Sequence, residues 1–157
     1  MRRGPLMSGA VAMIVVSLTL AACQAPGRVA SDAAGTGMVS FNAALTGTQC
    51  VPSVDTQGLG AGVMTYDPAT KELRWTIAYD RLSSPATAAH FHGPADPASN
   101  AGVAVPIAGP GMTGPITGSA TLSEAQAAEL LAGLWYVNVH SATYPGGEIR
   151  GQVQRAR

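Results

Sequence analysis

The sequence predicts an all-β domain, an antiparallel Greek-key-like β-sandwich or barrel with one short helix at about 123–132. Two observations predict this fold class. Apolar and polar residues alternate within short segments, as they do in half-buried strands. Residues that favour turns (Gly, Pro, Asp and Asn) separate these segments at short intervals. Because the chain has 157 residues and no internal repeat, we expect a single domain.

Seven segments have the length and composition of strands. The clearest has Leu73, Trp75 and Ile77 alternating with polar residues, and the turn-forming stretch 66–71 joins it to the preceding segment. The seven expected strands are Val39–Leu45, Gly60–Tyr66, Leu73–Tyr79, Thr87–His92, Gly118–Leu122, Leu134–Ser141 and Glu148–Gln154.

One segment carries the signals of a helix. Ser123 and Gln126 have the spacing of a capping box, and Glu124 suits the positive end of the helix dipole. Gly133 can end the helix, because glycine readily takes the left-handed conformation found there. We expect this helix to close one end of the sandwich.

The first 22 residues have the features of a lipoprotein signal peptide. A basic start precedes an apolar run that is too short to span a bilayer, and the run ends in Leu20-Ala21-Ala22-Cys23. These four residues resemble the bacterial lipobox, in which the cysteine is acylated and becomes the mature N-terminus. We therefore expect fatty acid, such as palmitate, on Cys23. The alternative is an ordinary secretory signal with an incidental cysteine.

Lipid on Cys23 would place the protein in the cell envelope, with a membrane as its first partner. Gln24 resembles the sorting pattern for the outer membrane, whereas a single-membrane envelope would mean the outer face of the cell membrane. Residues 23–37 are rich in Ala, Gly, Ser and Pro and are expected to form a flexible lipidated tether. The folded domain is then expected over 38–154.

Charge and motifs exclude several classes of function. The chain has 9 basic and 9 acidic residues, and removal of Arg2 and Arg3 with the signal leaves 7 against 9, a formal charge of −2. With Lys71 as its single lysine and no basic patch, the chain is not expected to bind nucleic acid. No paired carboxylates, Ser-His-Asp set or phosphate loop appears, so we expect no enzyme.

The three histidines of the chain fall in two of the expected strands. His90 and His92 flank Phe91 and therefore share one face of their strand, while His140 lies on the polar face of 134–141. Neutral imidazole is the commonest side-chain ligand for transition metals. His90, His92 and His140 are therefore candidate ligands for copper or zinc; the alternative is a set of structural or surface histidines.

A hairpin that closes through 141–147 would pair residues whose numbers sum to about 288. His140 would then face Glu148, and Asn138 would face Arg150. We expect Glu148 to orient His140, as carboxylates often do for metal-bound imidazoles, with Arg150 beside it. A cross-strand polar pair is the alternative for these two residues. A solvated loop carboxylate is the favoured interpretation of Asp96, and an oxygen ligand the other.

Cys50 would be the single cysteine left unmodified in the mature chain, so no intrachain disulfide is expected. Burial as a small apolar side chain is the favoured interpretation. Pairing between chains and soft metal ligation are the alternatives.

Three segments of the chain resemble the CHRD (chordin) domain family. They are Leu45–Pro52, Thr87–Ala95 and the run from Leu134-Trp135-Tyr136-Val137-Asn138-Val139-His140 through Tyr144-Pro145-Gly146-Gly147-Glu148-Ile149-Arg150-Gly151-Gln152. The resemblance implies a secreted or surface β-rich module. One departure is Gln49-Cys50-Val51-Pro52, where the family usually has Gln-Glu-Val-Pro. A thiolate there would favour a softer metal.

The chain is also similar, more weakly, to the Cu/Zn superoxide dismutases. His90-Phe91-His92 and Val139-His140 would take the places of that family's copper ligands. The zinc loop of the enzyme has no counterpart, so dismutase activity is not expected.

These features favour a lipid-anchored CHRD-domain module of the cell envelope, non-catalytic and acting in surface binding or interaction with an envelope or extracellular protein. The alternative is a copper or zinc binding protein whose three-histidine site has superoxide-dismutase-like geometry.

Overall fold

The computed structural model describes Met1, residues 37–108 and residues 112–157. The expected signal peptide, Cys23 and nearly all of the tether lie outside these residues. The described elements are β1 (Val39–Thr46), the 3-10 helix η1 (Gly47–Gln49), β2 (Leu59–Asp67), β3 (Glu72–Asp80), β4 (Ala86–His92), β5 (Val103–Ala108), β6 (Ile116–Thr121), α1 (Glu124–Leu131), β7 (Tyr136–Ser141), β8 (Ile149–Gln152) and β9 (Gln154–Arg155).

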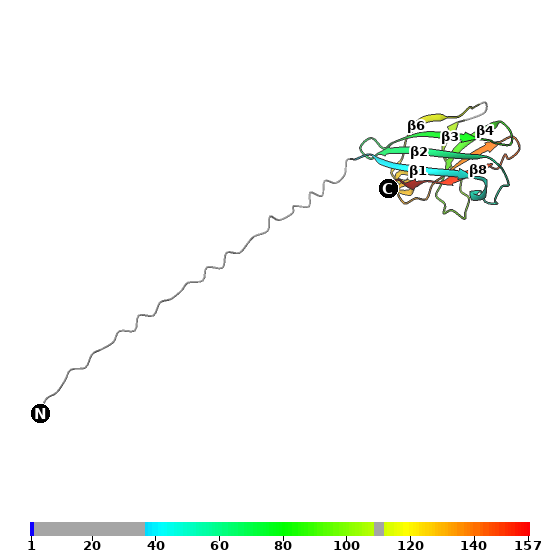
Figure 1. Cartoon of the computed structure of the whole chain (residues 1–157). Coiled ribbons are helices and arrows are strands. Elements are labelled where there is room, and N and C mark those ends of the chain that lie inside the picture. The colour runs from blue at the N-terminus through cyan, green and yellow to red at the C-terminus, as the bar shows by residue number, and fades with distance from the viewer. Residues whose placement is uncertain (2–36, 109–111) are drawn as a thin grey trace. The chain divides into compact units, whose positions relative to one another are not determined.

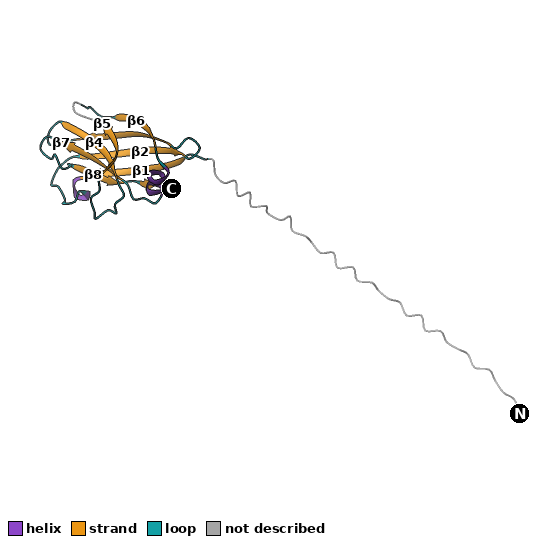
Figure 2. Ribbon diagram, turned by 180° about the vertical axis from the view of Figure 1, so that it is seen from behind, coloured by secondary structure: helices purple, strands orange, loops and turns teal. Residues whose placement is uncertain are grey.

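The strands form one antiparallel sheet in the order β5-β4-β7-β8-β1-β2-β3-β6, with β9 paired to β1. The two ends of this order, β5 and β6, approach each other, so the sheet is nearly a closed barrel. Strands β1, β2 and β3 run side by side (Figure 1), and the view from behind shows β4, β5 and β7 (Figure 2). The expected all-β, antiparallel fold class is confirmed.

The core forms because alternate residues of the strands point to the inside of the sheet. In β3, Leu73, Trp75 and Ile77 are buried while the residues between them are exposed. Each large apolar side chain buried in this way contributes about 1.5–3 kcal/mol. The buried core residues all lie between Phe41 and Val153, so the β-domain carries its own core.

Strand β5 was not among the expected strands. It contains Pro106, whose missing N–H argues against a central strand. The structure resolves the conflict, because β5 lies at the end of the strand order and pairs with β4. The expected strand 148–154 is also wrong in its extent: it divides into β8 and the short β9.

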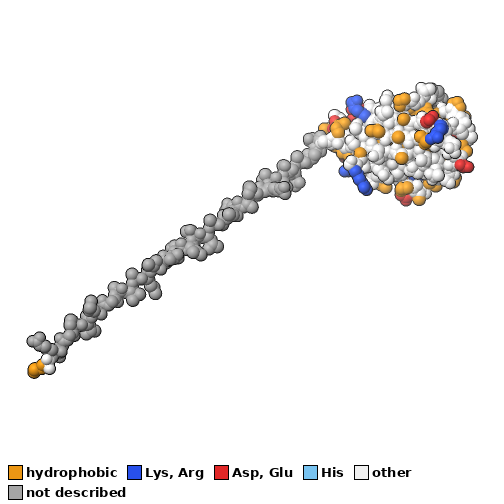
Figure 3. All heavy atoms as spheres, viewed as in Figure 1, with side chains coloured by type: hydrophobic (Ala, Val, Ile, Leu, Met, Phe, Trp, Pro, Cys, Tyr) orange, Lys and Arg blue, Asp and Glu red, His pale blue; other side chains and the backbone are white. Residues whose placement is uncertain are grey.

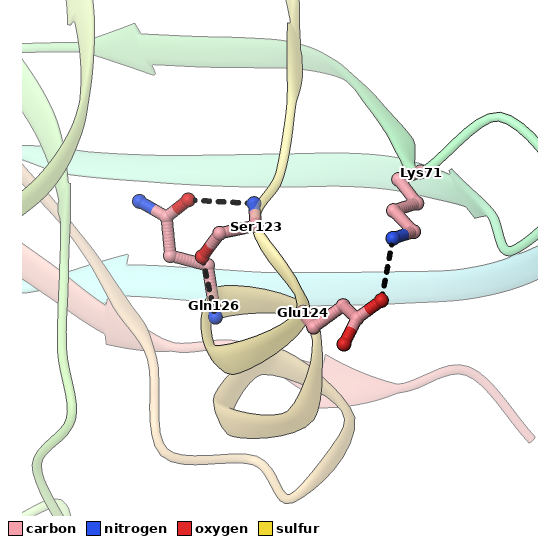
Figure 4. A network of polar contacts seen from close by, with 4 residues as sticks. All are labelled: Lys71, Ser123, Glu124 and Gln126. Atoms are coloured by element: carbon pink, nitrogen blue, oxygen red, sulfur yellow. Dashed lines mark hydrogen bonds and ion pairs between the residues drawn. The ribbon is translucent and has the colours of Figure 1, made fainter.

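Helix α1 has the expected capping box (Figure 4). Gln126 N donates to Ser123 Oγ at 3.2 Å, and Ser123 N donates to Gln126 Oε1 at 3.0 Å. An exposed ion pair joins Lys71 to Glu124 at 2.9 Å. Leu130 is buried in the core from the inner side of the helix. Gly133 follows the helix with φ of 75°. The helix lies at one end of the domain (Figure 2), as expected.

Two surface properties bear on function. On the face drawn in Figure 3, basic side chains are few and lie apart from one another. In the part of the chain that the structure describes, no helix is long and apolar enough to cross a membrane.

Candidate metal centre

The outer face of strands β4 and β7 brings the three histidines together. In the antiparallel register Ala88 pairs with His140 and His90 pairs with Asn138, so the two histidine-bearing strands lie next to each other. Phe91 is fully buried on the inner face, which turns His90 and His92 outward. One nitrogen from each imidazole can be chosen so that all three lie within 4.8 Å of one another. We call His90, His92 and His140 the three-histidine cluster.

The spacing within the cluster suits a shared metal ion. His90 Nδ1 lies 3.2 Å from His140 Nε2. Two nitrogens bound tetrahedrally to a metal at about 2.0–2.1 Å would be about 3.3 Å apart. The ring of His92 lies farther off, with its centroid 5.5 Å from that of His90 and 6.1 Å from that of His140.

Main-chain carbonyl groups fix two of the imidazoles. His92 Nδ1 lies 3.0 Å from Ala101 O, and His140 Nδ1 lies 2.9 Å from Pro145 O. Because a carbonyl oxygen only accepts, each Nδ1 carries the proton and each Nε2 has its lone pair. The lone pair of His140 Nε2 accepts a hydrogen bond from His90 Nδ1, so a metal ion bound by these two nitrogens would require the His90 proton to move to Nε2. His92 Nε2 is buried and has no hydrogen-bond partner among the described residues. Such an outer hydrogen bond with a free inner nitrogen is the usual arrangement of a metal-binding histidine.

The environment favours the neutral form of two imidazoles of the cluster, those of His90 and His92. Burial lowers the pKa of His90, and the neighbouring His140 and His92 lower it further. Burial also lowers the pKa of His92, although its hydrogen bond to Ala101 opposes the change. Neutral imidazoles are the form that binds metals. The donor set therefore fits copper or zinc, and three protein ligands leave a coordination position for another group.

The expected role of Glu148 is wrong. Its main-chain N–H donates to Val139 O at 2.8 Å, which extends the β7–β8 register, but the carboxylate lies elsewhere. It accepts hydrogen bonds from Thr56 Oγ1 at 2.6 Å, Ser83 N at 2.7 Å and Ser83 Oγ at 3.0 Å. Because Glu148 precedes β8, strand alternation does not set its side-chain direction. The carbonyl of Pro145 orients His140 in its place.

Arg150 lies beside the cluster but reaches it through Tyr136. The guanidinium carbon lies 3.6 Å from the centre of the Tyr136 ring, and that ring stacks on His92 with centroids 4.9 Å apart and planes 5° apart. The expected pairing of Asn138 with Arg150 is confirmed. The stack on His92 was not predicted, although the position of Tyr136 on the same strand face as His140 pointed towards it.

Cys50 and Asp96 lie outside the three-histidine cluster, which is the one group of potential metal ligands found among the described residues. Cys50 is buried, as the favoured interpretation held, and burial raises the pKa of its thiol to about 11 although nearby Arg150 opposes the rise. The thiol is therefore neutral at pH 7. Asp96 accepts a hydrogen bond from Ala98 N within its own loop.

Comparison with known proteins gave one match. A family model described as CHRD domain matches residues 41–153, within the expected domain 38–154. Neither the curated proteins nor the solved structures that were searched gave a match.

Proposed function

The chain belongs to the CHRD domain family, and we propose that this member binds one copper ion through His90, His92 and His140. The family is in general one of non-catalytic modules, and the proposal is accordingly one of binding without turnover. Of the two functions that the sequence left open, surface interaction and metal binding, we therefore prefer metal binding.

One observation carries the proposal. His92 Nε2 is buried without a partner and belongs to a cluster whose two other imidazoles present nitrogens 3.2 Å apart. A buried acceptor without a hydrogen bond costs about 1–3 kcal/mol, and a metal ion bound there would remove this cost. The carbonyl groups of Ala101 and Pro145 hold two rings in the required tautomer, which limits the loss of side-chain freedom on binding.

Copper is favoured over zinc by the ligand type. At a site of given nitrogen ligands, divalent copper binds more tightly than divalent zinc. A bound copper ion would supply a Lewis acid or one-electron centre with a position open to an outside ligand. The chain's own residues would hold the ion through three imidazoles, and the Tyr136 ring would support one of them, that of His92, by stacking on it.

We also propose that lipid on Cys23 anchors the domain in the cell envelope. The lipobox-like sequence Leu20-Ala21-Ala22-Cys23 supports this location. Growth with labelled palmitate should label the protein and not the Cys23→Ser variant. An unlabelled wild-type protein that is released from the cell would show an ordinary secretory signal.

Calorimetric titration of residues 24–157 tests copper binding, because the β-domain carries its own core. Cu(II), Cu(I) and Zn(II) are titrated into the wild type, a His90→Ala/His140→Ala variant and an Asp96→Asn control. We expect one copper ion per chain in the wild type and the control, and none in the histidine variant. A folded wild type that binds no metal would contradict the proposal, and surface contact with an envelope protein would then be the remaining interpretation.

A further inference from the structure

A buried cation, Arg150, lies next to the three-histidine cluster without being part of it. The side chain of Arg150 is only 1% exposed, and its two hydrogen bonds go to uncharged oxygens, Asn100 Oδ1 and Asp96 O, each at 3.1 Å. The two ion pairs found among the described residues are both on the surface and do not involve Arg150. A guanidinium has five N–H donors, so that of Arg150 has donors left for a ligand. Taking an unpaired charge out of water is costly.

A cavity of about 370 Å³ opens beside this guanidinium; we call it the Arg150 cavity. It is lined by Asn138 of β7, Arg150 of β8 and the 143–147 turn, among others. Its polar lining includes Arg150, Asn138 and the thiol of Cys50, and its apolar lining includes Val51 and Pro145. None of its lining residues, all of which are described, is acidic.

No described carboxylate forms an ion pair with Arg150, although the charge of Asp96 partly opposes the lowering of the pKa of Arg150 by burial. Glu148 is committed to hydrogen bonds from Thr56 and Ser83, and Asp96 to one from Ala98. Cys50 stands where the CHRD family usually has the glutamate of Gln-Glu-Val-Pro. Its thiol has a pKa of about 11 and stays uncharged at pH 7. Among the described residues, the guanidinium at the Arg150 cavity therefore has no directly paired carboxylate, and no acidic residue lines the cavity.

A second group in the cavity also lacks a partner. Asn138 Oδ1 is buried, and no described residue donates a hydrogen bond to it. Asn138 and Arg150 are partners across the β7–β8 pair, and both line the Arg150 cavity. An anion alone would satisfy only the guanidinium. A carboxylate with a neighbouring hydroxyl or amino group would satisfy both, because its oxygens accept from Arg150 and its donor reaches Asn138 Oδ1.

We propose that the Arg150 cavity is a binding site for a small carboxylate that carries an adjacent hydrogen-bond donor, such as a 2-hydroxy acid. The site is separate from the three-histidine cluster and does not depend on metal binding. The cavity has room for a molecule of several heavy atoms, and its apolar walls suit a short hydrocarbon substituent.

The test uses residues 24–157 freed of metal with a chelator that is then removed. Lactate, propionate and lactamide are titrated separately while ¹H–¹⁵N spectra report the Arg150 and Asn138 side chains. The three probes are matched: propionate lacks the hydroxyl and lactamide lacks the charge. We expect lactate to bind at least tenfold more tightly than either analogue and to shift both side-chain signals.

Three variants locate the site. Cys50→Glu places a carboxylate beside Arg150 and should abolish lactate binding in a folded protein, whereas Cys50→Ser should keep it. The His90→Ala/His140→Ala variant should also bind lactate as the wild type does, which separates this proposal from copper binding. Absence of lactate-dependent shifts in the wild type, equal affinity for propionate, or unchanged binding by folded Cys50→Glu would each overturn the proposal.

Discussion

The imidazole of His92 stacks on the phenol ring of Tyr136, with centroids 4.9 Å apart and ring planes only 5° apart. The guanidinium of Arg150 lies 3.6 Å from the centre of the same phenol ring. Tyr136 therefore contacts both the three-histidine cluster and the buried cation of the Arg150 cavity. It also accepts a hydrogen bond from Ala101 N, whose residue supplies the carbonyl that orients His92.

Replacing Tyr136 should weaken copper binding without removing a ligand. In Tyr136→Leu the His92 ring loses its stacking surface, and we expect the dissociation constant for copper to rise about tenfold, the lower end of the effect of losing a group that orients a ligand. Tyr136→Phe keeps the ring and should stay closer to the wild type. Competition with a chelator of known copper affinity measures both. A folded Tyr136→Leu protein with wild-type affinity would contradict this role.

Glu148 should make the stability of the domain depend on pH. Burial acts to raise the pKa of its carboxyl, but hydrogen bonds from Ser141, Thr56 and Ser83 together bring the pKa below its ordinary value. A carboxyl whose pKa is lower in the folded state stabilises the fold above its unfolded pKa, and this stability is lost as pH falls through the folded value.

We expect Glu148→Gln to reduce the free energy of unfolding by about 2 kcal/mol at pH 7, because the variant loses a charged hydrogen-bond acceptor. The difference from the wild type should be smaller at pH 3, because the stabilisation by the Glu148 carboxylate is lost as pH falls from the ordinary pKa of a glutamate towards the lowered pKa of the folded state. Urea unfolding at both pH values measures this, with Glu72→Gln, a half-buried carboxyl of a surface ion pair, as the control. A difference between wild type and Glu148→Gln that is the same at both pH values would contradict the account.

The helix cap and the nearby ion pair should differ in their effect on stability (Figure 4). Ser123→Ala removes the acceptor for Gln126 N and should cost about 1 kcal/mol. Lys71→Ala removes an exposed ion pair, which is screened by water, and should therefore cost less stability than the loss of the cap. Thermal unfolding of the two variants compares them directly. A larger loss for Lys71→Ala than for Ser123→Ala would show that the ion pair holds the helix.

Phe91 supports the metal centre from inside the sheet. Its ring packs between Trp75 and Trp135, with centroids 5.3 and 5.9 Å away. Phe91→Ala should cost about 3–5 kcal/mol, because it opens a cavity in the core. Val63→Ala, at a side chain that is 63% exposed, should change stability little. Urea unfolding measures both variants, and a loss under 1 kcal/mol for Phe91→Ala would mean that the core collapses around the gap.

Local patterns in the sequence predicted the parts of the fold that local physics determines. Alternation identified the buried face of β3, and the capping box identified α1. The sum rule for the β7–β8 hairpin gave the observed pairs Asn138 with Arg150 and Tyr136 with Gln152. Strand β5 was missed because Pro106 looks incompatible with a strand until its place at the sheet edge is known.

The sequence predicted the three candidate ligands of the site, but not the groups that orient them. Alternation alone puts His90 and His92 on one face, and the hairpin puts His140 on the polar face of its strand. The carbonyl groups that orient the rings belong to loop residues, Ala101 and Pro145. Sequence periodicity does not predict where the carbonyl group of a loop residue points. Glu148 failed as a prediction because a residue in a turn is not bound to the alternation of the strand that follows.

The most direct test of the account is a crystal structure of residues 24–157 grown with copper, with diffraction recorded on both sides of the copper absorption edge. We predict one anomalous peak per chain, about 2.0–2.1 Å from a nitrogen of each of His90, His92 and His140. A copper peak at any other place, or no peak in a domain whose three imidazoles keep their contacts to each other, would contradict the account.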